Sequence, residues 1–360
     1  MGFEQVLQKT WRDNLLFSVL VELTYRCNLD CFFCYNDLGL RGEPLRTDQY
    51  LDFFAELSDL QVLNLTLSGG EPLAHPDFLK LGACARELGF VVRVKSNGHA
   101  LRGEMARRVR DEVDPFLIEV SLHGATAATH DRQTRVPGSF DRLLANLREM
   151  LGLGLRVKLN STMTRWNEGE IEGMMALADG LGLPLQLDPE VTPRDDGDAE
   201  PLSIAPSREG LGRLFALQAE RAGSGAAAVS VAREGDEGIV PVPLAKHCGA
   251  GSAGIAVDPY GNVYPCVQWR RPVGNLHRQS IREIWSASAG LREVRELTAR
   301  AKEVVDAHGA AGPLLNFCPG LAATHTGDPL SVYPDALRRA EVLGEVLEQE
   351  KKRVLLPVVP

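Results

Sequence analysis

Six short apolar runs alternate with amphipathic stretches between residues 17 and 188, and this alternation constrains the fold more than any other feature. The apolar runs predict strands at 17–24, 62–67, 90–95, 116–122, 155–160 and 184–188. Helical periodicity between them predicts helices near 48–59, 76–88, 103–112, 140–151 and 168–181. Strands that alternate with helices form parallel sheets through right-handed crossovers. The sequence therefore predicts the α/β class, with a partial (β/α)6 TIM-like barrel.

The overall composition is ordinary for a globular protein, with 360 residues, 44% hydrophobic side chains and a formal net charge of −9. A negative net charge disfavours non-specific binding to nucleic acid or to anionic membranes. No apolar run reaches membrane-spanning length. The N-terminus, Met1–Gln5, lacks the charged region followed by an apolar core that is typical of a signal peptide. Seven cysteines, an odd number with metal-type spacing, indicate a reducing compartment. We therefore expect a cytoplasmic protein that binds neither nucleic acid nor membrane.

Changes in composition divide the chain beyond the predicted barrel. A polar, turn-rich loop begins at Pro189, a helix is predicted at 207–221, and the small residues of 222–228 indicate a linker. A charged periodic stretch at 332–352 predicts a C-terminal helix. The predicted segments are an N-terminal segment 1–16, a barrel core 17–225, a linker 226–243, a cysteine-bearing extension 244–330, and a C-terminal helix with its tail 331–360.

Cys27, Cys31 and Cys34 stand in C-x₃-C-x₂-C spacing directly after the first predicted strand. We call them the N-terminal cysteine set. Three thiolates so close together can hold three corners of a [4Fe–4S] cluster, which prefers soft sulfur ligands. A structural zinc site would want four closed ligands, and a disulfide framework does not suit a chain of this length without a secretory signal. The spacing therefore favours an iron–sulfur cluster with one open iron.

A second motif, Ser68-Gly69-Gly70-Glu71-Pro72, follows the second predicted strand. Paired glycines allow close backbone approach to a ligand, the Glu71 carboxylate can accept hydrogen bonds from an ammonium group, and Pro72 fixes the turn. Alone, this run is only a β-turn. Because ligand sites in such folds lie at the C-terminal ends of the strands, we expect the motif to lie on the same rim as the cysteine loop.

The two motifs together resemble the signature of the radical SAM superfamily. In that family the open iron binds the amino and carboxylate groups of S-adenosylmethionine (SAM), and the Gly-Gly-Glu-Pro motif holds the SAM amino group. The resemblance implies an enzyme that cleaves SAM to a 5′-deoxyadenosyl radical, which removes hydrogen from an unactivated C–H bond. It also implies an external reductant such as a flavodoxin or a ferredoxin.

The resemblance further implies contacts to SAM along the strand ends. Phe33 would lie by the adenine, or else pack in the core; an arginine, either Arg132 or Arg135, would pair with the SAM carboxylate, or else form a surface ion pair. His123 stands where an aspartate is more common, and we interpret it as a capping or packing residue. Thr162 fits a ribose or adenine contact. The expected cofactor-binding set is Phe33, Gly69, Gly70, Glu71, Pro72, Ser96, Asn97, Ser121, Arg132, Arg135, Asn160 and Leu187.

Cys248, Cys266 and Cys318 form a second group, which we call the C-terminal cysteine set. A hairpin predicted over 255–266 would bring Cys266 back towards Cys248. This segment resembles the SPASM or twitch extension of radical SAM enzymes, in which cysteines ligate auxiliary clusters. Three cysteines suffice for one auxiliary [4Fe–4S] cluster and not for the two of the full SPASM pattern; the alternative is three buried apolar thiols. The fourth ligand is left open among His247, His325, Asp328 and a substrate group, and we interpret Cys84 as a core thiol.

The overall likeness is to peptide-modifying radical SAM enzymes, such as those of pyrroloquinoline quinone biosynthesis. It implies modification of a ribosomally made peptide, by a cross-link or a side-chain change. The segment before Phe17 is too short for a leader-binding winged-helix domain, so we expect a separate small carrier protein to present the peptide. The alternatives are chemistry on a tetrapyrrole or another small molecule, and formylglycine generation on a sulfatase. A non-enzymatic electron carrier is a further alternative, although it would need no SAM site.

Overall fold

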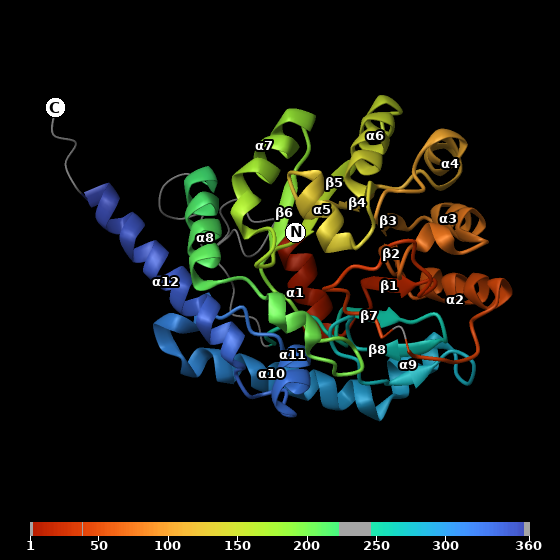
Figure 1. The fold of residues 1–360 in the computed structure, drawn as a ribbon. Coiled ribbons are helices and arrows are strands. Elements are labelled where there is room, and N and C mark those ends of the chain that lie inside the picture. Colours follow the sequence, from red (N-terminus) through yellow and green to blue (C-terminus); the bar gives the residue numbers. More distant parts are fainter. Residues whose placement is uncertain (1–2, 38, 223–245, 356–360) are drawn as a thin grey trace.

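The computed structural model describes residues 3–37, 39–222 and 246–355, and Figure 1 shows their arrangement. All six predicted strands are present, each within two residues of the expected bounds. The strands are β1 (Ser18–Glu22), β2 (Asn64–Ser68), β3 (Val91–Ser96), β4 (Leu117–Ser121), β5 (Val157–Thr162), β6 (Leu185–Asp188), β7 (Gly254–Val257), β8 (Asn262–Tyr264) and β9 (Gly274–Asn275).

The strands form one sheet in the order β6-β5-β4-β3-β2-β1-β7-β8-β9. Strands β1 to β6 run parallel, which confirms the βα-barrel prediction. The predicted hairpin is also present as β7 and β8, but it does not form a separate sheet, because β7 pairs in parallel with β1. This pairing satisfies the backbone groups along the free edge of β1, which would otherwise be exposed beside the core. The cysteine-bearing extension is thus attached directly to the strand that leads into the N-terminal cysteine set.

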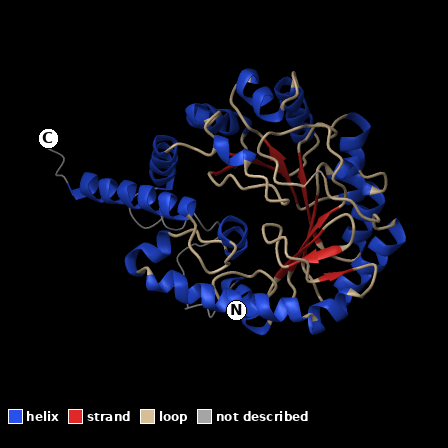
Figure 2. Ribbon diagram, turned by 60° about the horizontal axis from the view of Figure 1, so that its bottom comes forward, coloured by secondary structure: helices blue, strands red, loops and turns tan. Residues whose placement is uncertain are grey.

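Helices surround the outer side of the curved sheet (Figure 2). The helices of the described residues are α1 (Phe3–Asp13), α2 (Thr47–Asp59), α3 (Phe78–Glu87), α4 (Gly103–Arg108), α5 (Ala127–Thr134), α6 (Ser139–Gly152), α7 (Ile171–Leu181), α8 (Arg208–Ala222), α9 (Ile281–Ala287), α10 (Ala289–Ala307), α11 (Pro319–Thr326) and α12 (Pro334–Leu355). Of these, α12 extends away from the sheet (Figure 1). The predicted helix at 103–112 is α4 followed by a π-helical turn, Val109–Val113. The sequence prediction missed α1, α10, α11 and α5, of which α5 is a short polar helix. The predicted linker 226–243 lies outside the described residues.

The two faces of the parallel strands differ in chemistry. One face carries buried aliphatic side chains, such as Val19 and Leu65, which pack in one cluster with Phe54 of α2 and Leu147 of α6. The alternate side chains point to the inner face and are largely polar, as the period of two in a strand requires. On that face Glu119 of β4 is the cross-strand partner of both Lys95 of β3 and Lys158 of β5. The helices therefore cover the apolar face and leave a charged inner face.

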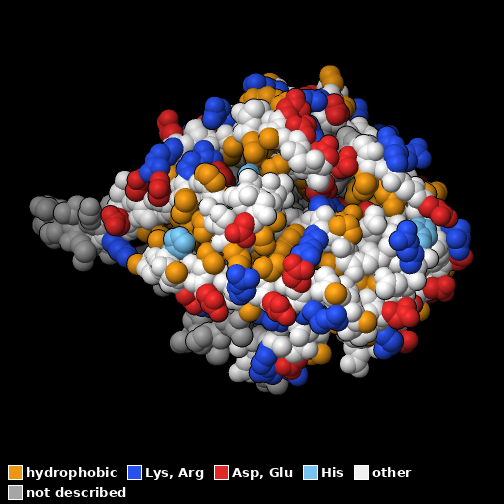
Figure 3. All heavy atoms as spheres, turned by 90° about the horizontal axis from the view of Figure 1, so that it is seen from below, with side chains coloured by type: hydrophobic (Ala, Val, Ile, Leu, Met, Phe, Trp, Pro, Cys, Tyr) orange, Lys and Arg blue, Asp and Glu red, His pale blue; other side chains and the backbone are white. Residues whose placement is uncertain are grey.

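Acidic and basic side chains are interspersed over the face shown in Figure 3 and do not gather in a single basic patch. Among the described residues, no helix is both long enough and apolar enough to cross a membrane.

Candidate functional site

The N-terminal cysteine set lies in the loop after β1, at the C-terminal ends of the strands, where the sequence predicted it. The backbone N–H groups of Asp30 and Phe32 donate to the carbonyls of Thr134 and Gln133, 3.1 Å away in both cases. Those carbonyls belong to the C-terminal turn of α5, whose last four C=O groups have no partner within the helix. The helix that sequence reasoning missed therefore holds the cysteine loop in place.

The three thiols of this set lie close enough to affect one another electrostatically. Burial raises the pKa of Cys34 to about 11, with a charge on Cys27 contributing to this shift. Burial also raises the pKa of Cys31 well above its usual value, with Cys34 and Cys27 adding to the effect. Thiolates grouped in this way need a positive partner, which iron supplies.

Three cysteine thiols in one loop have the soft sulfur donors that an iron–sulfur cluster takes. Among the residues that the structure describes, no three His, Cys, Asp or Glu side chains converge closely enough to bind one metal ion. A [4Fe–4S] cluster binds each cysteine to a different iron, so its thiolates stand farther apart than the ligands of one ion do. All three cysteines are free thiols.

The Gly-Gly-Glu-Pro motif packs directly on the chain that leads into the cysteine loop. The N–H of Gly70 donates to the carbonyl of Thr24 at 2.7 Å, and the N–H of Glu71 donates to that of Arg26 at 3.0 Å. A Cβ on Gly70 would lie 2.7 Å from the carbonyl oxygen of Tyr25, and Gly69 has a φ of +137°, which few side chains tolerate. The sequence suggested that these glycines make room for a ligand. In the structure they make room for the chain's own backbone.

The Glu71 carboxylate is bonded to donors of the chain itself. Its side chain is buried, and both oxygens are already bonded: Oε1 accepts from the Leu73 N–H at 3.1 Å, Oε2 from the Asn97 N–H at 2.8 Å, and the Ser96 hydroxyl lies 2.9 and 3.1 Å from the two oxygens. Burial raises its pKa to about 7, although these donors oppose the shift. The carboxylate thus joins the motif to the end of β3, and its expected bond to the SAM ammonium group stays a prediction.

We expect Glu71→Gln to lower the free energy of unfolding of the cluster-free protein by about 1–3 kcal/mol, because the amide nitrogen would face a buried N–H donor of Asn97 or Leu73. Urea unfolding followed by circular dichroism measures this loss. The exposed Glu87 of α3 provides the control, and Glu87→Gln should leave stability unchanged. Unchanged stability of Glu71→Gln together with weaker SAM binding would instead support the expected bond to SAM.

The Ser96–Asn97 segment links this buried acid to the cysteine loop. The side-chain amide of Asn97 donates to the Asn28 Oδ1 at 2.8 Å and lies 3.7 Å from the Cys27 Sγ. An amide donor stabilises thiolate charge and lowers the pKa of Cys27, which burial raises. Asn97 therefore lies beside the cysteine set and contacts both Cys27 and Glu71, whereas Ser96 bonds Glu71.

The other residues expected to contact SAM lie on different faces of the sheet. Ser121 and Asn160 are cross-strand partners on the inner face, and Asn160 donates to Glu119 at 2.7 Å. Leu187 is 6% exposed and packs with Met163 and other residues in a cluster on the helix-covered face of the sheet. The strand alternation turns its side chain away from the inner rim. A contact of Leu187 with SAM would therefore come from its backbone, and it stays a prediction.

Phe33 lies edge-on to His123, with ring centroids 4.7 Å apart. Burial lowers the pKa of His123 to about 3, so this ring is neutral and packs as the sequence suggested. The two candidate arginines are exposed and stack on aromatic rings, Arg132 at 4.2 Å from the Trp166 centroid and Arg135 at 4.7 Å from that of Phe32. Arg135 also pairs with Asp30 at 3.4 Å. The choice between the two arginines as partner of a SAM carboxylate stays a prediction.

The C-terminal cysteine set also comes together in space. Cys266 follows β8, and Cys318 precedes the first turn of α11. Burial raises the pKa of Cys318 to about 12, with the charges of Cys266 and Cys248 contributing, and it raises that of Cys248 to about 11. Because these thiols affect one another's pKa values, they lie close together, as expected if the hairpin returns Cys266 towards Cys248. As in the N-terminal cysteine set, burial and neighbouring cysteines raise the pKa values of the thiols.

The proposed fourth ligands have other contacts. His247 Nε2 lies 2.6 Å from the carbonyl of Phe317, His325 stacks on Tyr333 at 4.9 Å, and Asp328 accepts from the Leu330 N–H at 2.9 Å. The nearest polar contact of Cys318 is Gln268, whose Oε1 lies 3.6 Å from the Sγ. None of these contacts identifies the fourth ligand.

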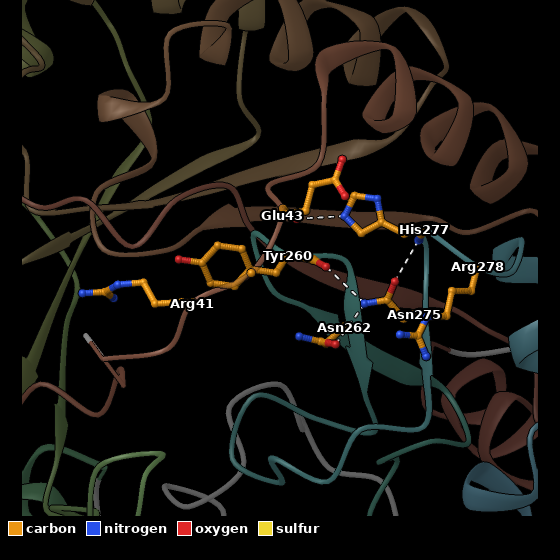
Figure 4. Close-up of a pocket in the computed structure, with 8 residues that line it drawn as sticks. Arg41, Glu43, Tyr260, Asn262, Asn275, His277 and Arg278 are labelled. Atoms are coloured by element: carbon orange, nitrogen blue, oxygen red, sulfur yellow. Dashed lines mark hydrogen bonds between the residues drawn. The ribbon is translucent and has the colours of Figure 1, made fainter.

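A polar cavity of about 310 Å³ lies elsewhere, between the hairpin tip and the loop around Gly42 (Figure 4). Its side chains bond to one another and to nearby carbonyls: His277 Nε2 lies 2.8 Å from the carbonyl of Glu43, and Asn275 donates to Tyr260 and Asn262. No expected site residue lines this cavity.

Two family models match the chain. The model of the radical SAM superfamily matches residues 21–178, and that of the SPASM iron–sulfur cluster-binding domain matches residues 248–307. The mycofactocin maturase MftC of Mycobacterium tuberculosis is 32% identical over 76% of this chain and 71% of its own. The chain belongs to the radical SAM superfamily. It is therefore an enzyme whose radical SAM domain binds a [4Fe–4S] cluster and SAM, and whose SPASM domain binds auxiliary iron–sulfur clusters.

Further comparisons agree with this membership. The PqqA peptide cyclase of Ruegeria pomeroyi is 31% identical to this radical SAM protein over 88% of the chain and 86% of the relative. The AdoMet-dependent heme synthase of Methanosarcina barkeri is 28% identical over 76% and 83%. Native anSMEcpe with bound AdoMet and the Cp18Cys peptide superposes with a TM-score of 0.68 over 94% of this chain and 99% of that one, at 15% identity, which shows a shared fold.

Proposed function

We propose that this enzyme modifies a ribosomally made peptide by removing a hydrogen atom from one of its C–H bonds. The observation that carries the proposal is the presence of both cysteine sets in a chain similar along most of its length to a mycofactocin maturase and to a PqqA peptide cyclase. When bound, the first cluster and SAM supply a 5′-deoxyadenosyl radical for this step. The product is a cross-link or an altered side chain.

The proposal gives the residues of the rim distinct tasks. Cys27, Cys31 and Cys34 hold the SAM-binding cluster, and Asn97 stabilises the Cys27 thiolate. The turn from Gly69 to Pro72 presents backbone groups to SAM, while the Glu71 carboxylate fixes that turn to β3. The side chains proposed to contact SAM are those of Phe33, Ser121, Asn160 and one of Arg132 and Arg135.

The charged side chains on the inner face of the sheet favour the proposal that the substrate is polar. Lys95 and Arg93 have side chains 46% and 39% exposed, and they flank the mostly buried Glu119 at 3.5 and 3.7 Å. Strand β6 ends the sheet at one side and β9 at the other, so the sheet does not close into a complete barrel. Because an open sheet gives access to its inner face, an extended peptide can reach the strand ends from this side.

The remaining parts of the proposal concern the setting of the enzyme. We place the radical SAM core at 17–225 and the auxiliary-cluster domain at 244–330, with the C-terminal cysteine set holding one [4Fe–4S] cluster. A small carrier protein presents the peptide, and a flavodoxin or ferredoxin supplies electrons. We propose a cytoplasmic location, since exposed clusters need a reducing compartment.

We expect the anaerobically reconstituted enzyme, given SAM and dithionite, to remove hydrogen from a short peptide that is encoded beside its gene. Mass spectrometry of the peptide should show the loss of a pair of hydrogen atoms or another defined change, with 5′-deoxyadenosine formed in proportion. The variant lacking the N-terminal cysteine set is the negative control. A peptide that stays unchanged while a porphyrin precursor of heme is converted would instead favour the tetrapyrrole chemistry for which the Methanosarcina relative is named.

A further inference from the structure

A buried ionic cluster lies between the two cysteine sets. At its centre is Glu22, the last residue of β1, whose side chain has no exposed surface. Arg270 binds both of its oxygens, Nη1 to Oε2 at 2.9 Å and Nη2 to Oε1 at 2.8 Å. The hydroxyls of Tyr25 and Tyr35 also donate to this carboxylate, at 3.1 and 3.2 Å. Four donor groups, two from Arg270 and one from each tyrosine, therefore converge on one buried carboxylate.

Arg270 has a second acidic partner on its remaining side. Its Nε lies 2.9 Å from the Oδ2 of Asp195, which belongs to the polar loop after β6. The N–H of Asp195 in turn donates to the carbonyl of Tyr35 at 2.7 Å. The Arg270 guanidinium also lies 5.1 Å from the ring centroid of Tyr264 and 5.7 Å from that of Tyr35. A single guanidinium thus connects the end of β1, the loop after β6 and the hairpin of the SPASM extension.

Each part of this cluster is close in sequence to an expected cluster ligand. Tyr25 precedes Cys27 by two residues, and Tyr35 follows Cys34 directly. On the other side, Arg270 follows Cys266 by four residues, and the turn between them is closed by the Trp269 N–H, which donates to the Cys266 carbonyl at 3.1 Å.

The C-terminal side of this turn is equally constrained. A Cβ on Gly320 would lie 2.7 Å from the Gln268 carbonyl and 2.8 Å from the Trp269 Cβ. The start of α11, which carries Cys318 before its first turn, is therefore packed directly on the turn that holds Arg270. A movement of Arg270 would displace both Cys266 and Cys318 relative to the N-terminal cysteine set.

Stability alone does not account for this arrangement. Burying a guanidinium and two carboxylates costs desolvation energy, and well-packed apolar side chains often stabilise a fold as well or better. What the ionic cluster supplies is geometry, because a bidentate pair with a third contact fixes the orientation of the guanidinium plane.

We propose that Arg270 is a positioning residue that fixes the relative placement of the two cysteine sets by binding Glu22 and Asp195. The inference rests on the proposed function, since it takes the two sets as the ligands of two clusters. Iron analysis of the wild-type enzyme tests that assumption separately: about 8 irons per chain support two [4Fe–4S] clusters before any Arg270 variant is made.

Arg270→Lys tests the proposal because lysine keeps the charge but offers a point donor in place of the planar fork. We expect the variant to keep the wild-type iron content, with an altered magnetic interaction between the two reduced clusters in its EPR spectrum. A misplacement of about 1 Å can cost about 100-fold in rate, so the ratio of SAM cleaved to peptide modified should rise at least about tenfold. The neighbouring Arg271 is half-exposed and pairs with Glu293 on α10, so Arg271→Lys is the matched control and should leave both readouts unchanged.

A second variant, Glu22→Gln, covers the case in which Arg270→Lys does not fold. It leaves Arg270 paired with Asp195 and keeps one acceptor oxygen, so the same spectral change is expected with retained iron. A wild-type EPR spectrum in both variants would overturn the proposal. Loss of iron or of the folded state in both would also overturn it, because the ionic cluster would then support the fold and not the spacing of the two sets.

Discussion

Replacing Cys27, Cys31 and Cys34 together by alanine should reduce the reductive cleavage of SAM to background. These thiols lie together in the loop after β1, and they are the only expected ligands of the cluster that binds SAM. Without them no iron is held beside the Gly-Gly-Glu-Pro turn, so electrons cannot reach the SAM sulfonium. The variant should also lose about 4 of about 8 irons per chain. Formation of 5′-deoxyadenosine under dithionite and iron content measure the two effects.

Cys84 provides the control for this experiment. It is a free thiol on α3 that packs, partly buried, against the main hydrophobic core. Cys84→Ala removes one thiol outside both cysteine sets, so it should retain SAM cleavage and the full iron content. If the variant lacking the N-terminal cysteine set still formed 5′-deoxyadenosine, the SAM-binding cluster would have to be held elsewhere in the chain.

The barrel was predictable because its strands are short, buried and bounded by polar or glycine residues. Each of β1 to β6 carries enough aliphatic side chains to mark it without knowledge of its neighbours. The location of the N-terminal cysteine set followed from the same pattern, because loops after parallel strands meet at one rim. Helix α5 escaped prediction because its eight residues, Ala127–Thr134, are mostly polar and show little apolar periodicity.

The direction in which individual side chains point was harder to predict from the sequence. The sequence shows an acid after two glycines, but whether Glu71 faces a ligand or the chain depends on where the N–H of Asn97 lies, 26 positions later. In β6, the alternation of side chains places Leu187 on the helix-covered face. An error of one residue in the predicted register would move this side chain to the inner face. The pairing of β7 with β1 and the contact of Glu22 with Arg270 join segments more than 200 residues apart, and no local pattern encodes them.

Replacing Cys248, Cys266 and Cys318 together by alanine should separate SAM cleavage from peptide modification. These thiols lie on the hairpin side of the sheet and before α11, so the N-terminal cysteine set and the Gly-Gly-Glu-Pro turn keep their own contacts. We expect iron to fall from about 8 to about 4 per chain. Some SAM cleavage should persist, whereas the modified peptide should no longer form, because the auxiliary cluster serves the substrate or accepts an electron from the product radical.

The comparison with the first triple variant makes this result specific. Both variants lose three thiols and the same amount of iron, so a difference between them reports the location of the lost cluster and not a general loss of iron. Mössbauer spectra and anaerobic product analysis should therefore show 5′-deoxyadenosine without modified peptide in this variant, and neither product in the first. A different outcome would contradict this prediction. If the wild-type enzyme and the variant lacking Cys248, Cys266 and Cys318 both held only about 4 irons per chain and formed modified peptide at the same rate, these cysteines would be buried thiols that hold no cluster.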